Sequence, residues 1–169
     1  MLSQNNKIAF WSLILIISSL IYYIENIIKL PIPFLRFGFS HIITLFLIFN
    51  NFSLLEILGI NILKIIIGSI LSGTFFSLIF YASIFSNFFS ILFQYLLFYY
   101  LSKFISIYSI SSAGSILNSF LLFTFLAIFI AKQINILYYY QYMYIFSFFT
   151  GLLNAFLTNL IIKKIKVKL

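Results

Sequence analysis

Long apolar stretches separated by short polar breaks run along the whole chain. Segmentation at polar residues and prolines gives candidate spans over residues 8–28, 38–50, 57–81, 84–102, 112–131 and 138–162. A helix needs about 20 apolar residues to cross the ~30 Å hydrocarbon core of a bilayer, so the second segment is short for a span. The pattern predicts an all-α fold, an integral membrane bundle of about six transmembrane helices.

The strongest break separates the first two segments, at residues 29–37. Pro31 and Pro33 remove backbone donors there and push the residues before them out of helical conformation. Further breaks are predicted at 50–53, 83–87, 103–112 and 132–142. The first apolar stretch is too long for the core of a signal peptide and no A-x-A cleavage site follows, so we expect it to be retained.

Composition agrees with this pattern. Of the 169 residues, 64% are hydrophobic and only 7% are charged, whereas about a quarter of an ordinary soluble domain is charged. The predicted spans use most of this length. We therefore expect a single transmembrane domain over residues 1–169, without an extramembrane domain.

The chain is basic, with ten Lys and Arg residues against two acidic residues and a formal net charge of +8. Apart from Lys64, these cations lie at segment ends or in the tail, as is typical of topology signals and of contact with anionic lipid head groups. The charge therefore predicts the lipid bilayer as a partner, and no nucleic acid. We expect the protein to lie in the cell (inner) membrane. The positive-inside rule predicts that both of its termini lie in the cytoplasm. Lys7, Lys103 and the tail lysines would then lie inside, and Lys29, Arg36 and Lys132 outside.

Residue types that carry most enzyme chemistry are scarce. The sequence has no Cys and no Asp, its two carboxylates are Glu25 and Glu56, and His41 is its one histidine. Aspartate-rich magnesium sites, zinc clusters and thiol nucleophiles therefore lack their residues, and no Gly-rich phosphate loop occurs. We expect no catalytic activity, no metal site and no cofactor.

Polar side chains at membrane depth are the candidates for function, because each is costly to bury in lipid. Glu25 precedes Lys29 by four residues, a spacing that permits a helical ion pair, while a ligand-facing role is the alternative. Arg36 and His41 flank the start of the second segment, where a Pro-containing loop would present them to an anionic solute or to lipid head groups. The candidate ligand contacts are Glu25, Arg36, His41, Asn87, Gln94 and Asn118.

Other polar and small residues indicate helix packing. Lys64 lies about one third into the third segment, and we expect it to extend toward the cytoplasmic interface, near Glu56. Amides such as Asn118 and Asn154 in the last two segments can hold helices together or line a cavity. Small residues at four-residue spacing predict close helix contacts, at Gly68 with Ser72, Ser69 with Gly73, Gly151 with Ala155, and residues 111–115.

Several motifs resemble a known family. They are Ile24-Glu25-Asn26, Pro31-Ile32-Pro33 and the stretch from Phe37 to Leu45, with supporting matches over 63–76 and 150–159. Together they are similar to the Gx transporter family, which is also labelled heptaprenyl diphosphate synthase component I. The family pattern usually has Asn where His41 stands, a Gly pair near Ser86-Asn87 and a His-Asn pair near Leu117-Asn118.

The family is similar to the S components of energy-coupling-factor vitamin transporters, which are six-helix membrane proteins with an outward pocket. The resemblance implies an S-component-like substrate-binding subunit for a small metabolite, which we expect from the basic loop to be anionic or amphipathic. Its implied partners are the solute and separate ATPase and coupling subunits. The alternative is a noncatalytic membrane partner, component I, of a heptaprenyl diphosphate or quinone-precursor synthesis system. A membrane-embedded enzyme is the last choice.

Overall fold

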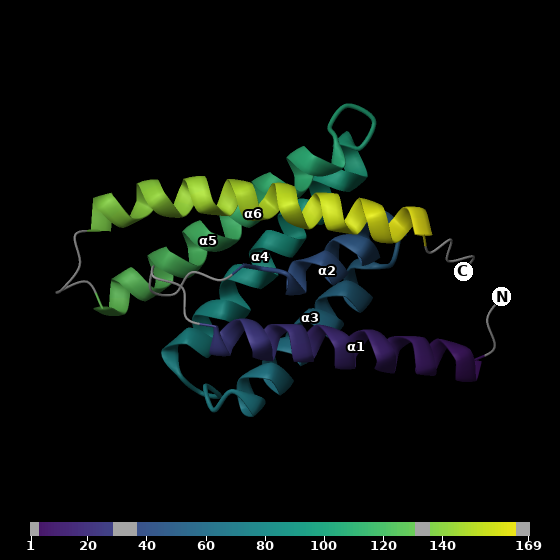
Figure 1. The fold of residues 1–169 in the computed structure, drawn as a ribbon, viewed down its shortest axis with the longest axis horizontal. Coiled ribbons are helices and arrows are strands. Elements are labelled where there is room, and N and C mark those ends of the chain that lie inside the picture. The colour runs from purple at the N-terminus through teal and green to yellow at the C-terminus, as the bar shows by residue number, and fades with distance from the viewer. Residues whose placement is uncertain (1–3, 29–36, 131–135, 165–169) are drawn as a thin grey trace.

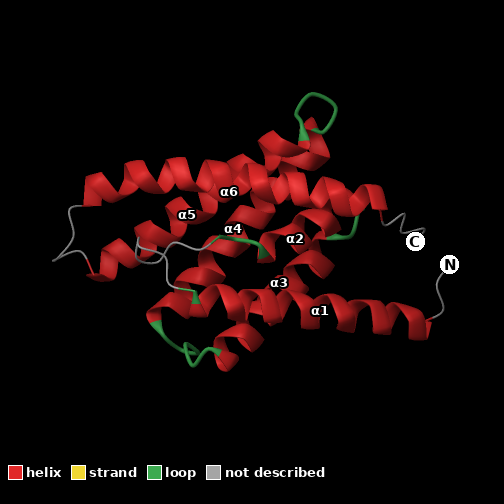
Figure 2. Ribbon diagram, viewed as in Figure 1, coloured by secondary structure: helices red, strands yellow, loops and turns green. Residues whose placement is uncertain are grey.

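The computed structural model describes residues 4–28, 37–130 and 136–164, and their regular secondary structure is all helical (Figures 1 and 2). This confirms the predicted all-α bundle of about six helices. The helices are α1 (Gln4–Ile27), α2 (Ser40–Phe49), α3 (Leu54–Leu71), α4 (Leu78–Leu101), α5 (Ile107–Ile130) and α6 (Ile136–Lys164).

All of these helices except α2 are long and apolar enough to cross a membrane. Their outer faces carry large apolar side chains, among them Leu55, which is 82% exposed, and Ile128, which is 71% exposed. Apolar surface on this scale is disfavoured in water and favoured in lipid. The chain is therefore a multi-pass membrane protein.

Helix α2 lies inside the bundle. Its ten residues extend about 15 Å, half the thickness of the hydrocarbon core. It packs against α1, α3, α4 and α6, and Leu45, Leu47 and Ile48 are fully buried. Because α2 is too short to span the hydrocarbon core, backbone groups at its ends lie at membrane depth and need partners from the surrounding helices. In Figure 1 it lies between α1 and α6.

The prediction of one span over 57–81 followed by a turn at 83–87 is wrong. The turn between α3 and α4 lies at 72–77 instead. Gly73 and Phe76 adopt φ angles of +69° and +59° in this turn, a conformation that cannot continue a right-handed helix. Helix α4 then continues without interruption through the predicted break.

The polar residues at 83–87 do not end α4, because the side chains of Ser86 and Asn87 find partners within the helix. Ser86 Oγ and Asn87 Nδ2 donate to the carbonyl oxygen of Ser83, at 3.3 and 2.8 Å. Such bonds to the preceding turn let polar residues remain in a helix at membrane depth. In the same way, α5 begins at Ile107, inside the break predicted at 103–112.

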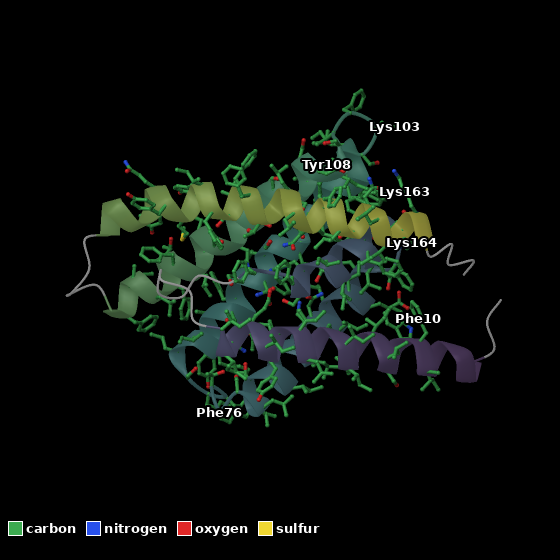
Figure 3. The ribbon with its side chains drawn as sticks, viewed as in Figure 1. Phe10, Phe76, Lys103, Tyr108, Lys163 and Lys164 are labelled. Carbon is green, nitrogen blue, oxygen red and sulfur yellow. The ribbon has the colours of Figure 1, made fainter. Side chains whose placement is uncertain are left out.

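The beginning of α1 and the end of α6 lie at the same end of the bundle (Figure 1). Lys103, Lys163 and Lys164 lie at this end as well (Figure 3). The positive-inside rule assigns such a cationic end to the cytoplasmic side of the membrane, and this orientation stays a prediction. The remaining cations of that prediction lie outside the residues whose side chains are described: Lys7, Lys29, Arg36, Lys132 and the tail lysines beyond Lys164.

Small residues let three pairs of helices approach closely, as predicted for Gly68, Gly151 and residues 111–115. The predicted close contact at Gly73 is wrong, because this residue lies in the turn after α3 with no other described segment within 4 Å of its Cβ position. Gly68 of α3 lies against Tyr22 and the backbone of α1. Gly114 of α5 faces α4, and Gly151 of α6 faces the backbone of Ser112 in α5. Close contact matters here because no hydrophobic effect drives apolar helices together in lipid.

We expect Gly151→Ala to destabilise the protein. A Cβ at this position would lie 2.5 Å from Cα of Ser112 and 3.1 Å from the carbonyl oxygen of Ser111. Backbone atoms cannot rotate away, so α5 and α6 must separate and strain the 2.7 Å hydrogen bond from Ser111 Oγ to the Gly151 carbonyl. Overpacking of this kind costs about 1–3 kcal/mol. The midpoint of thermal unfolding in detergent should fall accordingly.

Gly59→Ala is the matched control. This glycine lies in α3, and no atom beyond its chain neighbours and the nearby backbone of its own helix lies within 4 Å of the position that a Cβ would occupy. Alanine is favoured over glycine in a helix by about 1 kcal/mol. Its unfolding midpoint should stay the same or rise. Equal midpoints for the two variants would show that the α5 and α6 contact does not depend on Gly151.

Candidate functional site

A polar cavity of about 60 Å³ lies inside the bundle, where α1, α2, α4, α5 and α6 meet. Leu122, Phe123 and Met143 contribute its apolar surface. Serine hydroxyls contribute to its polar lining, together with Glu25, His41, Asn87, Asn118 and Asn154.

The start of α2 forms one wall of this cavity. Gly38 turns the chain into the helix with a φ of +70°, a conformation that favours glycine. The backbone N–H of Phe39 then donates to a carboxylate oxygen of Glu25, near the end of α1. A carboxylate at a helix N-terminus satisfies a donor that has no partner within the helix and is favoured by the helix dipole. Glu25 therefore fixes the start of α2 to α1.

Helices α5 and α6 hold the same segment from another side. Asn154 Nδ2 of α6 donates to the carbonyl oxygen of Gly38 at 3.0 Å. Asn118 Nδ2 of α5 lies 3.2 Å from His41 Nε2, in the first turn of α2. The beginning of α2 is thus bonded to side chains from both halves of the sequence.

Lys64 of α3 lies behind this wall and is only 1% exposed. Its Nζ donates to the carbonyl oxygen of Ser40 at 3.3 Å and to Asn61 Oδ1 at 2.6 Å. The same Asn61 oxygen accepts a hydrogen bond from Thr44 Oγ1 at 2.8 Å. Lys64 also interacts electrostatically with Glu25, so the cation has partners at this depth.

The prediction that Lys64 extends to the interface near Glu56 is wrong. Glu56 lies at the exposed start of α3, where it forms a capping box with Ser53. Lys64 turns inward instead, because α2 brings the Ser40 carbonyl within reach of its ammonium group. Snorkelling applies to a cation at a lipid-facing position, whereas this one faces another helix.

The structure brings most of the predicted site residues together. Gln94 is buried against Gly114 between α4 and α5, outside the lining of the cavity. Arg36 and Lys29 lie outside the described residues, so the predicted basic loop and the Glu25–Lys29 ion pair remain predictions. The four candidates that line the cavity are Glu25, His41, Asn87 and Asn118.

Asn154 and Ser83 were not among the sequence-predicted candidates, yet both line the cavity. Asn154 could have been identified as a candidate because it is an amide at membrane depth within the motif at 150–159. An amide that only joins helices gives the same signal. No comparable signal existed for Ser83, since the chain is rich in serine.

Several buried polar atoms of the cavity have no hydrogen-bond partner within the described part of the chain. They are His41 Nδ1, Ser83 Oγ, Asn118 Oδ1 and Asn154 Oδ1. Leaving such a group unpaired costs about 1–3 kcal/mol, so buried polar atoms are normally satisfied. The arrangement can therefore hydrogen-bond a small guest molecule.

Residues 14–161 match the model of the family described as heptaprenyl diphosphate synthase component I. The chain belongs to this family. The match includes every residue of the cavity, and it confirms the family resemblance noted in the sequence. No curated protein and no solved structure matches the chain.

In this component I family member we expect Glu25 and Lys64 to be coupled in stability. Glu25→Gln leaves a buried ammonium without its opposite charge, and Lys64→Met leaves a buried carboxylate. Removing one of two buried opposite charges leaves the other uncompensated, so each single variant should lower the unfolding midpoint. The double variant removes both charges, so it should unfold at a higher temperature than either single variant. Thermal unfolding of the four proteins in detergent forms the double-mutant cycle.

Glu56→Gln is the control, because it changes an exposed carboxylate of α3. Its cost should stay below about 1 kcal/mol. Strictly additive losses for Glu25→Gln and Lys64→Met would contradict the coupling.

Proposed function

We propose that this chain is the substrate-binding membrane subunit, S-component-like, of a transporter for a small metabolite. The observation that carries the proposal is the polar cavity inside the bundle, with unpartnered polar atoms on α2, α4, α5 and α6. Other buried atoms without a partner in the described residues, such as Gln94 Oε1 and Ser112 Oγ, lie outside the cavity lining, whereas these atoms line one cavity. Polar groups that converge on one cavity at membrane depth favour a site for a polar guest.

The short helix α2 supports the same proposal. Helix α2 begins next to the cavity and extends only about half the thickness of the membrane. Many transporters place the ends of such discontinuous helices at their substrate sites near the middle of the bilayer. The start of α2 and the residues around it, Glu25 and His41 among them, are therefore the proposed binding elements.

The energy source of the proposed uptake lies in other subunits. The sequence contains no Gly-rich phosphate-binding motif, which is consistent with separate ATPase and coupling subunits. The expectation of an anionic or amphipathic solute rested on the basic loop around Arg36. Since that loop lies outside the described residues, the cavity itself is the better guide to the solute.

Affinity purification of the tagged protein in mild detergent tests the proposal. We expect mass spectrometry to find stoichiometric ATPase and coupling subunits, and a small molecule retained by the wild-type protein. Asn118→Ala should reduce the retained molecule by about tenfold, because it removes a polar contact from the cavity. Asn159→Ala, which lies outside the cavity lining, is the matched control and should retain it.

The family description favours a second candidate, a noncatalytic component I partner of a heptaprenyl diphosphate or quinone-precursor synthesis system. In that case a soluble prenyl synthase should copurify, without an ATPase, and its activity should change when the membrane subunit is removed. This result would contradict the transport proposal. The absence of catalysis by this chain stays a prediction under either candidate.

A further inference from the structure

The pairing of His41 with Asn118 restricts which chemical groups the cavity can bind well. His41 is only 8% exposed, and its Nε2 lies 3.2 Å from the Asn118 amide nitrogen. The other polar atom of each side chain, Nδ1 of His41 and Oδ1 of Asn118, has no partner within the described residues. Both side chains line the cavity.

When His41 is neutral, the His41–Asn118 pair leaves one donor and one acceptor free in either of its two hydrogen-bonding arrangements. If the Asn118 amide donates to His41 Nε2, the free atoms are an N–H donor at His41 Nδ1 and an oxygen acceptor on Asn118. If the amide is turned round, His41 Nε2–H donates to the oxygen of Asn118. The free atoms are then a lone pair at His41 Nδ1 and an N–H donor on Asn118. The pair always offers one donor and one acceptor.

Asn154 adds an acceptor whose position is fixed. Its Nδ2 donates to the Gly38 carbonyl at 3.0 Å, and a carbonyl cannot accept from the amide oxygen. Oδ1 is therefore the atom left unpartnered, in a side chain that is 1% exposed. Ser83 Oγ, also unpartnered, can donate or accept.

The charges around the cavity favour a neutral guest. Among the described lining residues, Glu25 has the one formal negative charge, and its carboxylate already accepts the Phe39 N–H. Lys64, behind the wall, supplies the balancing positive charge. A charged guest would add an uncompensated charge in the interior of the bundle, which is costly where water is scarce.

We propose that the cavity binds its ligand through a neutral group that carries two N–H donors and a carbonyl acceptor, such as a primary carboxamide. Its N–H groups donate to the side-chain oxygens of Asn154 and Asn118, and its carbonyl accepts from His41 Nδ1–H. The apolar remainder of the ligand lies against Phe123 and Met143. This inference rests on the proposed solute-binding function and names the chemical class of the solute.

Three probes of nearly the same shape test this class: benzamide, benzoate and benzamidine. The first has a donor and an acceptor, the second only acceptors, and the third only donors with a positive charge. Benzamide at about tenfold over its dissociation constant should raise the unfolding midpoint of the wild-type protein in detergent by about 3–6 °C. Equal concentrations of benzoate and benzamidine should shift it by less than about 1 °C.

Two variants and a matched control locate the benzamide. Asn118→Ala and Asn154→Ala should each weaken its apparent affinity by about tenfold, because each leaves a ligand group unpaired. Asn159→Ala, outside the lining, should bind benzamide as the wild-type protein does. A benzamide shift that is the same in all three variants would place the probe elsewhere and overturn the inference.

The outcomes separate this inference from the proposed function. A larger shift with benzoate or benzamidine, or none with benzamide, overturns the donor-and-acceptor class. If the purified protein nevertheless retains a metabolite and copurifies with ATPase subunits, solute binding stands and only the class is wrong. If it copurifies with a prenyl synthase and no ATPase, the proposed function itself fails.

Discussion

A helix that begins within a membrane protein brings backbone donors and acceptors to a place where water cannot satisfy them. In this chain α2 begins there, and side chains from α1, α3 and α6 supply the partners. Glu25 accepts from Phe39, Lys64 donates to Ser40, and Asn154 donates to Gly38. Since these residues are far apart in the sequence, their helices must meet around the start of α2. The arrangement of the bundle depends on this requirement.

The same requirement produces the cavity. Glu25 and Asn154 both hold the start of α2 and line the polar space beside it. Side chains that fix a backbone segment are themselves immobilised, and such preorganisation lowers the entropy cost of binding a guest. In this protein, the groups that stabilise the fold are also those that a guest molecule would contact. A substitution at either position therefore affects both stability and binding.

Outside this polar centre, the helices pack as expected in a lipid bilayer. Apolar side chains cover the outer faces of the long helices, and close packing at Gly68, Gly114 and Gly151 brings the backbones together. Hydrogen bonds cross between helices at these contacts, for example from Ser111 to the carbonyl of Gly151. Polar bonds and tight packing thus replace the hydrophobic effect that holds a soluble core together.

The sequence by itself determined the class of the protein, because long apolar runs in a chain with few charges permit little besides membrane helices. It also identified four functional candidates that line the cavity, because polar side chains are costly to bury at membrane depth: Glu25, His41, Asn87 and Asn118. Only the tertiary structure decided which way Lys64 extends, where the turn after α3 lies and that Asn154 joins the cavity. The physical reason is that a polar side chain in a membrane takes its partner from whichever helix lies next to it. That neighbour is fixed by packing between distant segments, and local pattern does not contain it.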